Sequence, residues 1–202
     1  MAVKDHTLDD KIIKAAWKEF MEHGFQKASL HKIADNAGIT TGALYTRYKN
    51  KDALFYSLVE EAMNSVKTSF VPLREKYYAV EKSRSIDEFL EVMAYERGLY
   101  LEILFQYYDE CKLLFCRNTG SSIEVMMDKA MEIKVKETVA FFERLSGRQS
   151  DLNGVELIIT EQFQYYRLIL QRGYNKEEAL SCMKTVELFL EAGWKKLFEQ
   201  IM

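Results

Sequence analysis

Residues that break helices are scarce in this chain of 202 residues, which has a single proline and nine glycines. A protein built from many short strands needs frequent turns, and those turns favour glycine and proline. The shortage therefore argues against an all-β fold and favours an all-α one. Hydrophobic residues make up 48% of the chain and charged residues 29%, which is typical of a folded globular protein and not of a disordered one.

Cysteine is also scarce, with only Cys111, Cys116 and Cys182. An odd number without Cys-X-X-Cys spacing predicts neither a disulfide framework nor a zinc site. The sequence has no uncharged run of 18 residues, and residues 1–10 lack the basic-then-apolar order of a signal peptide. We therefore expect a reduced, soluble, cytoplasmic protein with no membrane partner and no bound metal.

The side chains that catalysis uses most often are missing from most of the chain. All three histidines, His6, His23 and His31, lie within the first 31 residues, so a nucleophile in the larger part has no histidine near it in sequence. No glycine-rich phosphate loop, G-x-S-x-G elbow or H-E-x-x-H motif occurs. The sequence predicts that the protein is not an enzyme and needs no cofactor.

The charges are unevenly placed along the chain. The formal net charge is −3, yet residues 1–55 hold nine basic residues against seven acidic ones, and residues 56–202 hold 19 against 24. A local field, and not the total charge, steers a protein towards phosphate. The asymmetry gives mild support for nucleic-acid binding by the N-terminal part.

Helical periodicity dominates the N-terminal part. Apolar residues recur at three- and four-residue spacing over residues 8–20, which predicts an amphipathic helix that Gly24 ends. Ser29 caps a short second helix, Gly38 supplies a tight turn, and Thr40 caps a short third helix. Two short helices joined by a glycine turn make a helix-turn-helix, whose second helix enters the major groove of DNA.

The third helix, residues 41–48, is the expected reader of DNA. Leu44 and Tyr48 lie four residues apart and face inward, which leaves a polar outer face that begins with small residues. Threonine methyl groups suit thymine, and arginine suits a guanine edge or a phosphate. The outer face consists of Thr41, Gly42, Ala43, Tyr45, Thr46 and Arg47, and the basic residues Lys49 and Lys51 follow it.

Long helices are expected for the rest of the chain. The first runs from Asn50 towards Pro72 and contains the domain boundary, so that residues 1–55 form a helix-turn-helix domain and residues 56–202 a second helical domain. The later helices are predicted at Ile86–Tyr107, Glu110–Cys116, Ile123–Ser146, Gly154–Arg172 and Lys176–Gln200.

The ordered pattern over residues 8–55 resembles the N-terminal domain of the tetracycline-repressor (TetR) family of transcriptional regulators. The residues that carry the resemblance are Ile12, Ile13, Ala15, Ala16, Phe20, Gly24, Phe25, Ser29, Ile33, Ala34, Ala37, Gly38, Ile39, Leu44, Tyr45, Tyr48, Lys51 and Leu54. The resemblance implies an all-α protein with an N-terminal three-helix DNA-binding domain and a C-terminal helical bundle that binds a ligand and dimerises. It also implies a homodimer on a palindromic double-stranded DNA operator, usually a repressor that a small-molecule effector releases.

The resemblance also implies which residues of this sequence contact DNA. The implied DNA-contacting residues are Ser29, His31, Thr40, Thr41, Gly42, Ala43, Tyr45, Thr46, Arg47, Tyr48, Lys49 and Lys51. His31 is as well explained as a solvated surface residue, because one histidine by itself carries little information.

The remainder of the chain holds 20 of the 26 aromatic residues. They line either an adaptable apolar cavity or an ordinary filled core. The polar residues that we select for such a cavity are Tyr100, Gln106, Tyr107, Gln162 and Tyr166.

The last two predicted helices have broad apolar faces. In the family these helices form a four-helix bundle across a two-fold axis, so they are the expected dimer interface, although burial within one subunit also explains such faces. The selected interface residues are Leu157, Ile158, Phe163, Ile169, Leu170, Val186, Phe189, Leu190 and Trp194.

Two other functions stay open on the sequence. One is a helical protein–protein adaptor that does not bind DNA. The other is a regulator that senses oxidants through Cys111, Cys116 or Cys182, for which the thiol would need an exposed, electropositive setting.

Overall fold

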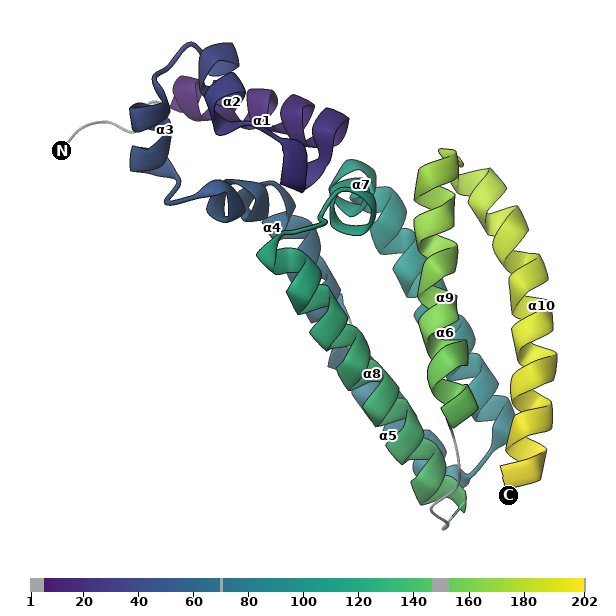
Figure 1. Ribbon diagram of the computed structural model, residues 1–202. Helices are drawn as coiled ribbons and strands as arrows, with labels where there is room; N and C mark the ends of the chain where they lie inside the picture. The colour runs from purple at the N-terminus through teal and green to yellow at the C-terminus, as the bar shows by residue number, and fades with distance from the viewer. Residues whose placement is uncertain (1–5, 70, 147–152, 202) are drawn as a thin grey trace. The chain divides into compact units, whose positions relative to one another are not determined.

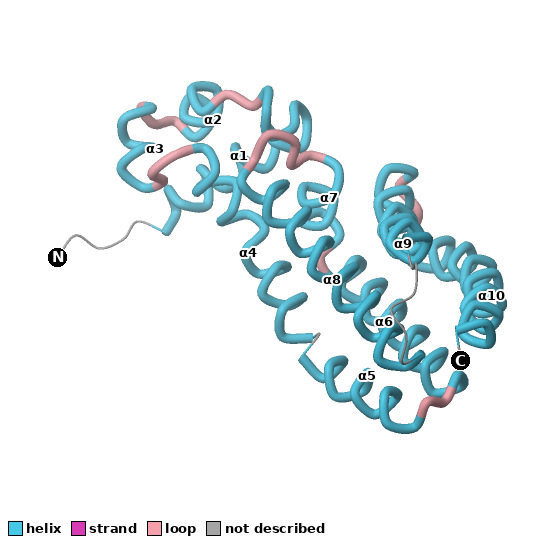
Figure 2. Tube along the Cα trace, turned by 60° about the horizontal axis from the view of Figure 1, so that its bottom comes forward, coloured by secondary structure: helices cyan, strands magenta, loops and turns pink. Residues whose placement is uncertain are grey.

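The computed structural model describes residues 6–69, 71–146 and 153–201, and within these ranges the chain consists of helices and short loops without a strand (Figure 2). The predicted all-α class is therefore confirmed. The helices are α1 (His6–Lys27), α2 (Leu30–Ala37), α3 (Thr41–Arg47), α4 (Lys51–Ser69), α5 (Val71–Ser83), α6 (Ile86–Gln106), α7 (Tyr108–Cys116), α8 (Ser122–Ser146), α9 (Asn153–Arg172) and α10 (Lys176–Ile201), labelled in Figure 1.

The chain divides into two compact units. The first unit consists of Met1–Met63 together with Asp109–Asp128, and the second of Asn64–Tyr108 together with Lys129–Met202. The division differs from the boundary expected at residue 55, because a distant segment joins the first unit. The Phe25 N–H donates to the Arg117 carbonyl at 2.7 Å, and the Ser122 N–H donates to the Asp52 carboxylate at 2.6 Å.

The predicted helix-turn-helix is present in the first unit. The Ser29 hydroxyl accepts from the Lys32 N–H and caps α2, and the Thr40 hydroxyl accepts from the Ala43 N–H at 3.1 Å and caps α3. Gly38 has a φ of 72°, the left-handed conformation that the tight turn requires.

An aromatic cluster supports the helix-turn-helix. The Phe20 and Phe55 rings lie 4.9 Å apart and the Phe25 and Phe55 rings 5.2 Å apart, all three side chains being buried. Gly24 allows this contact, since its φ of 70° and ψ of 168° turn the chain sharply before Phe25. The cluster fixes the end of α1 against the start of α4.

The helix expected from Asn50 to Pro72 is instead two helices, α4 and α5, and α5 was not predicted. Pro72 is the second residue of α5, where a proline removes no intrahelical hydrogen bond, so it begins a helix here and does not end one. The five later helices are confirmed to within two residues at each end.

The second unit has its own aromatic core. The Phe89 ring lies 5.5 Å from the Phe142 ring and 5.9 Å from the Trp194 ring, which joins α6, α8 and α10. Phe141 and Phe198 complete the cluster against Phe89. In the part of the chain that the structure describes, no helix has both the length and the apolar character of a membrane span.

Candidate functional site

The outer face of α3 is a solvent-exposed polar surface, which we call the α3 surface and define as Thr41, Gly42, Ala43, Tyr45, Thr46 and Arg47. Leu44 anchors the helix, since it is only 1% exposed, whereas the neighbouring Tyr45 is 51% exposed. Gly42 and Thr46 are exposed as well, and Tyr48 is half-buried. Leu44 is thus buried as predicted, whereas Tyr48, which was predicted to face inward, is only half-buried, and so are Thr41 and Ala43 of the predicted outer face.

Two residues of the α3 surface are held by local contacts. The Thr46 hydroxyl donates to the Gly42 carbonyl at 3.0 Å, which holds the side chain in one rotamer. The Arg47 Nε–H donates to the Asp9 carboxylate at 2.9 Å, which joins α3 to α1. This contact was not predicted from the sequence, because 38 residues separate Asp9 from Arg47.

The basic residues around α3 are of two kinds. Lys49 is exposed, whereas the Lys51 ammonium donates to the Gln26 carbonyl at 3.2 Å and lies 4.8 Å from the centre of the Phe25 ring. Burial lowers the pKa of Lys51 for this reason, despite the opposing effect of the Asp52 and Glu19 carboxylates. Lys51 was expected to contact phosphate, but in the structure it ties α4 to the end of α1.

The other two predicted contacts before α3 also have local partners. The exposed His31 imidazole lies 2.8 Å from the Asp35 carboxylate on the next turn of α2. The Ser29 hydroxyl caps α2, and the Ser29 N–H donates to the buried Glu19 carboxylate at 2.9 Å. Ser29 thus caps α2 and also ties its start to α1, whereas Thr40 caps α3.

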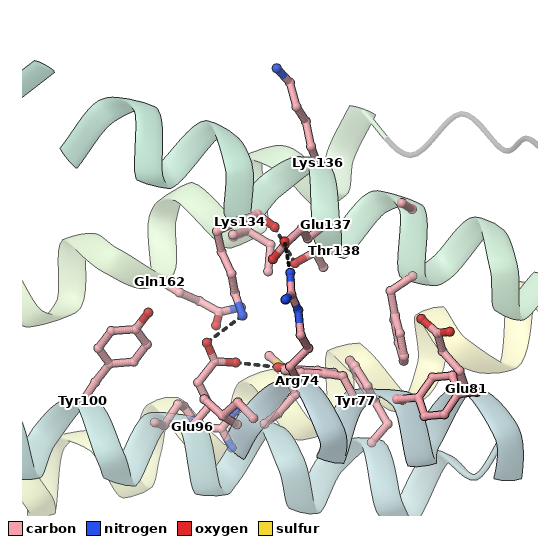
Figure 3. A pocket seen from close by; sticks show the side chains of 18 of the residues that line it. Arg74, Tyr77, Glu81, Glu96, Tyr100, Lys134, Lys136, Glu137, Thr138 and Gln162 are labelled. Atoms are coloured by element: carbon pink, nitrogen blue, oxygen red, sulfur yellow. Dashed lines mark hydrogen bonds and ion pairs between the residues drawn. The ribbon is translucent and has the colours of Figure 1, made fainter. Parts of the chain in front are cut away.

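The second unit contains a cavity of about 780 Å³ with walls from α5, α6, α8 and α9 (Figure 3). Three of the five residues selected from the sequence, Tyr100, Gln162 and Tyr166, line it. The prediction was wrong for the other two. Gln106 is the exposed last residue of α6, and Tyr107 is its C-cap, so both lie beyond the part of α6 that faces the cavity.

A buried carboxylate lies at the cavity wall. Glu96 is 5% exposed, and one of its oxygens accepts from the Tyr77 hydroxyl at 2.5 Å while the other accepts from the Lys134 ammonium at 2.6 Å (Figure 3). The ammonium also lies 5.1 Å from the centre of the Tyr77 ring. Sequence reasoning missed this cluster, because its members come from three helices and each alone looks like a surface residue.

The tyrosines of the cavity are held in their neutral form. Burial raises the pKa of Tyr77, Tyr100 and Tyr166 well above its ordinary value, and the nearby Glu96 carboxylate raises each of them further. A neutral phenol both donates and accepts a hydrogen bond, so these side chains add polar groups to an otherwise aromatic wall.

The apolar faces of α9 and α10 are only partly open. Exposed apolar side chains are present, and the largest exposures are those of Leu157 (70%), Leu188 (71%) and Phe189 (75%), with Ile158, Leu168 and Leu180 also exposed. Leu168, Leu180 and Leu188 were not selected from the sequence, although their spacing from Leu157 and Phe189 on the same helices was visible there.

Several residues selected for the dimer interface belong to the subunit's own interior. The prediction was wrong for four buried residues, Ile169, Leu170, Leu190 and Trp194. Phe163 and Val186 are partly buried and pack against the core of the second unit. The helical periodicity identified the apolar faces of α9 and α10. It did not distinguish the residues that are buried within the subunit from those that stay exposed.

The three cysteines occupy different environments. Cys111 is buried, and burial together with the Glu110 carboxylate raises the pKa of its thiol to about 12, which suppresses the reactive thiolate. Cys182 is exposed, and Cys116 is intermediate. Among the described residues no group of three histidine, cysteine or acidic side chains is arranged to hold a metal ion.

Comparisons with known proteins agree with the geometry of the first unit. Residues 12–58 match the family described as bacterial regulatory proteins, tetR family. An HTH-type transcriptional regulator, SAB2452, of Staphylococcus aureus (strain bovine RF122 / ET3-1) is 28% identical over 113 residues, which is 55% of this chain and 54% of that protein. The fatty acid metabolism regulator protein of Bacillus subtilis (strain 168) is 34% identical over 73 residues, 36% of this chain and 38% of that protein.

The whole fold also has a known counterpart. The crystal structure of a TetR-like transcriptional regulator from Rhodococcus sp. RHA1 aligns with this chain at a TM-score of 0.57 and 16% sequence identity. The alignment covers 92% of this chain and 96% of that one. This likeness concerns the fold alone, and the alignments with the two curated relatives span about half or less of their length. Residues 12–58 therefore match the tetR family of bacterial regulatory proteins, and the chain as a whole shares its fold with a TetR-like transcriptional regulator.

Proposed function

We propose that the protein is a cytoplasmic transcriptional regulator, a homodimeric repressor that binds a palindromic DNA operator and is released by a small-molecule effector. The observation that carries the proposal is the α3 surface, where a capped helix anchored by buried Leu44 presents small and polar side chains to solvent. A helix of this kind, second in a helix-turn-helix, reads base edges in the major groove. The match of residues 12–58 to a family of bacterial regulatory proteins supports the same function.

Individual roles follow from the geometry of α3. The exposed Tyr45 hydroxyl is suited to a phosphate oxygen, which positions the protein without reading sequence. The methyl group of the exposed Thr46 is suited to a thymine methyl group, a contact that does read sequence. Arg47 keeps donors beyond the Nε–H that Asp9 occupies, so its guanidinium is able to reach a base edge or a phosphate.

Dimerisation is proposed through the exposed apolar residues of α9 and α10. Large apolar side chains as exposed as Leu157, Leu188 and Phe189 are costly to leave in water, and a protein–protein interface would cover them. Two subunits related by a two-fold axis would set two α3 surfaces roughly 34–36 Å apart, one turn of DNA. Phe189→Asp should give monomers in sedimentation equilibrium, whereas a dimer of unchanged stability would exclude this face.

The effector is proposed to bind in the cavity of the second unit. Its volume of about 780 Å³ lies within the range of small-molecule sites, roughly 300–1,000 Å³. Release from DNA requires an effector that binds the DNA-free state more tightly than the DNA-bound state.

Selection of bound sequences from random DNA, followed by fluorescence anisotropy on the selected duplex, tests the proposal. We expect a palindromic sequence whose affinity falls linearly with salt on logarithmic axes, because cations are released from phosphates. Tyr45→Ala should weaken binding to all duplexes by roughly tenfold, the value of one charge-assisted hydrogen bond. Tyr95→Ala, which removes a comparably exposed tyrosine from α6, is the matched control. Absence of sequence-specific, salt-dependent binding by the dimer would exclude the regulator.

A further inference from the structure

The cavity of the second unit contains buried hydrogen-bond donors that nothing in the described residues satisfies. The Arg97 Nε–H and the Gln162 side-chain NH₂ are buried and have no partner there. Arg97 is itself only 9% exposed and uses another nitrogen, Nη2, to donate to the Glu187 carboxylate at 2.9 Å. Buried donors without a partner are rare in folded proteins, because they lose their hydrogen bonds to water and gain none in return.

The acceptor at the cavity wall, in contrast, is already engaged. Both oxygens of the Glu96 carboxylate are occupied, one by Tyr77 and one by Lys134. The Lys134 ammonium has three N–H donors, of which Glu96 takes one (Figure 3). The unused hydrogen-bonding capacity of this wall therefore consists mainly of donors, and it calls for a ligand with acceptor oxygens.

The charges around the cavity indicate the charge of that ligand. Five basic side chains line it, and four of them pair with a carboxylate: Arg74 with Glu137, Arg97 with Glu187, Lys134 with Glu96 and Arg144 with Glu81. The donors left over on Arg97 and Lys134 nevertheless belong to cationic groups, which bind an anion more strongly than a neutral acceptor. Carboxylate also forms stronger hydrogen bonds with arginine and lysine than a neutral carbonyl does.

The rest of the lining is aromatic. The Tyr100 ring lies 5.3 Å from the Phe163 ring and 5.2 Å from the Tyr166 ring, and Phe89 and Phe141 stack at 5.5 Å on another part of the wall. Such surfaces bind an apolar body.

We infer that the cavity binds an amphipathic carboxylate, whose head accepts hydrogen bonds from Gln162, Arg97 and Lys134 and whose apolar body packs on the aromatic rings. The inference rests on the proposed function, since it names the chemical class of the effector. The hydrogen-bond donors of the cavity specify only the carboxylate head of the ligand. A long-chain acid and an aromatic acid share that head, and the experiment below distinguishes them.

Isothermal titration of the full chain with matched compounds tests the head group. The probes are dodecanoate, 1-dodecanol and dodecyltrimethylammonium, with 2-naphthoate and 2-naphthylmethanol as a second pair, all below their aggregation limits. At least one carboxylate should bind about tenfold more tightly than its alcohol, as a charge-assisted hydrogen bond predicts, and dodecyltrimethylammonium should bind more weakly than dodecanoate. The pair whose carboxylate binds more tightly than its alcohol shows whether the apolar body of the ligand is a long chain or an aromatic ring system. An alcohol or the ammonium binding as tightly as the carboxylates, or no binding by either carboxylate, overturns the inference.

Two variants localise the head. Gln162→Leu removes the unpartnered NH₂ group, and Arg97→Lys removes the Nε–H while it keeps a cation for Glu187. Each should weaken binding of the preferred carboxylate by about tenfold and leave binding of its alcohol unchanged. Gln164→Leu, the same change at an exposed position of α9, is the matched control. Unchanged carboxylate affinity in both variants, with the melting temperature of the parent protein retained, overturns the assignment.

DNA binding is measured on the same preparations without any carboxylate. Sequence-specific DNA binding without carboxylate binding refutes this inference and leaves the regulator standing. Carboxylate binding without DNA binding refutes the regulator and leaves the cavity assignment standing.

Discussion

The α3 surface and the cavity place their polar groups in opposite settings. On the α3 surface the side chains are largely exposed, and the Arg47–Asp9 ion pair lies near solvent. At the cavity the Glu96–Lys134 ion pair lies in the interior, with Glu96 almost wholly buried. A solvent-exposed pair contributes little to stability, whereas breaking a buried pair leaves an uncompensated charge. Substitutions on the α3 surface should therefore leave the first unit folded. Substitutions of the buried polar groups at the cavity should lower the stability of the second unit.

The largest expected effect is the loss of stability at alkaline pH, and it should be larger in the second unit. The pKa values of Tyr77, Tyr100 and Tyr166 are raised above 10, so these phenols ionise in the unfolded chain first. Their contribution is fully present below pH 10 and is lost as pH rises, with a slope of about 4 kcal/mol per pH unit for three protons. In the first unit, Cys111 has a pKa raised from 9 to about 12, and it contributes a slope of about 1.4 kcal/mol per pH unit over that interval.

Denaturant unfolding followed by tryptophan fluorescence measures this difference. The chain has two tryptophans, Trp17 in the first unit and Trp194 in the second, so Trp17→Phe and Trp194→Phe each leave one reporter. Equal slopes for the two reporters above pH 10 would contradict the contrast between the units.

The second effect in size is that of Lys134→Met, which leaves the Glu96 carboxylate buried with one partner fewer. We expect the second unit to lose roughly 3 kcal/mol of unfolding free energy, at the lower end for a buried pair because Lys134 retains some exposure. Adding Glu96→Gln should recover most of the loss, since it removes the unpaired charge. Lys129→Met, the same change at an exposed position of α8, should alter stability by less than about 0.5 kcal/mol. A loss that the double variant does not recover would mean that packing, and not charge, was removed.

The two regions also differ in what the sequence predicted. The α3 surface follows from local signals, because the caps Ser29 and Thr40, the turn at Gly38 and the inward Leu44 all lie within 16 residues. The cavity was found only in part. Tyr100 and Tyr166 were predicted as polar groups in an aromatic region, but the Glu96 cluster depends on how helices distant in sequence pack together.

Other contacts between residues distant in sequence were not predicted either. Asp9 reaches Arg47 across 38 residues, and Arg117, the residue that follows α7, accepts a hydrogen bond from the Phe25 N–H in the first unit. Neither has a periodicity or motif to mark it. Burial of Trp194 and Leu190 likewise depends on neighbours in the fold, since an apolar stripe looks the same whether the subunit or its partner covers it.

The third prediction tests whether the α3 surface reads sequence independently of stability. Thr46→Ala should reduce discrimination at one operator position by roughly 1–3 kcal/mol if the methyl group contacts a base. It should not lower the unfolding free energy, because alanine favours helix and the lost bond to Gly42 is exposed. Fluorescence anisotropy with single-base operator variants measures the discrimination, and thermal melting measures the stability. An equal loss on every duplex would remove Thr46 from the residues that read sequence.

The smallest effect concerns the exposed ion pair of the first unit. Asp9→Asn removes the carboxylate that holds the Arg47 guanidinium and that repels phosphate. Stability should fall by less than about 1 kcal/mol, whereas operator affinity should rise by about two- to fivefold, since the guanidinium no longer has to leave a competing anion. Asp10→Asn removes the same charge from an exposed neighbouring position that does not contact Arg47. It therefore separates release of the Arg47 guanidinium from the weaker repulsion of phosphate. If Asp9→Asn binds the operator more weakly than Asp10→Asn, the carboxylate of Asp9 orients Arg47 for DNA and does not compete for it.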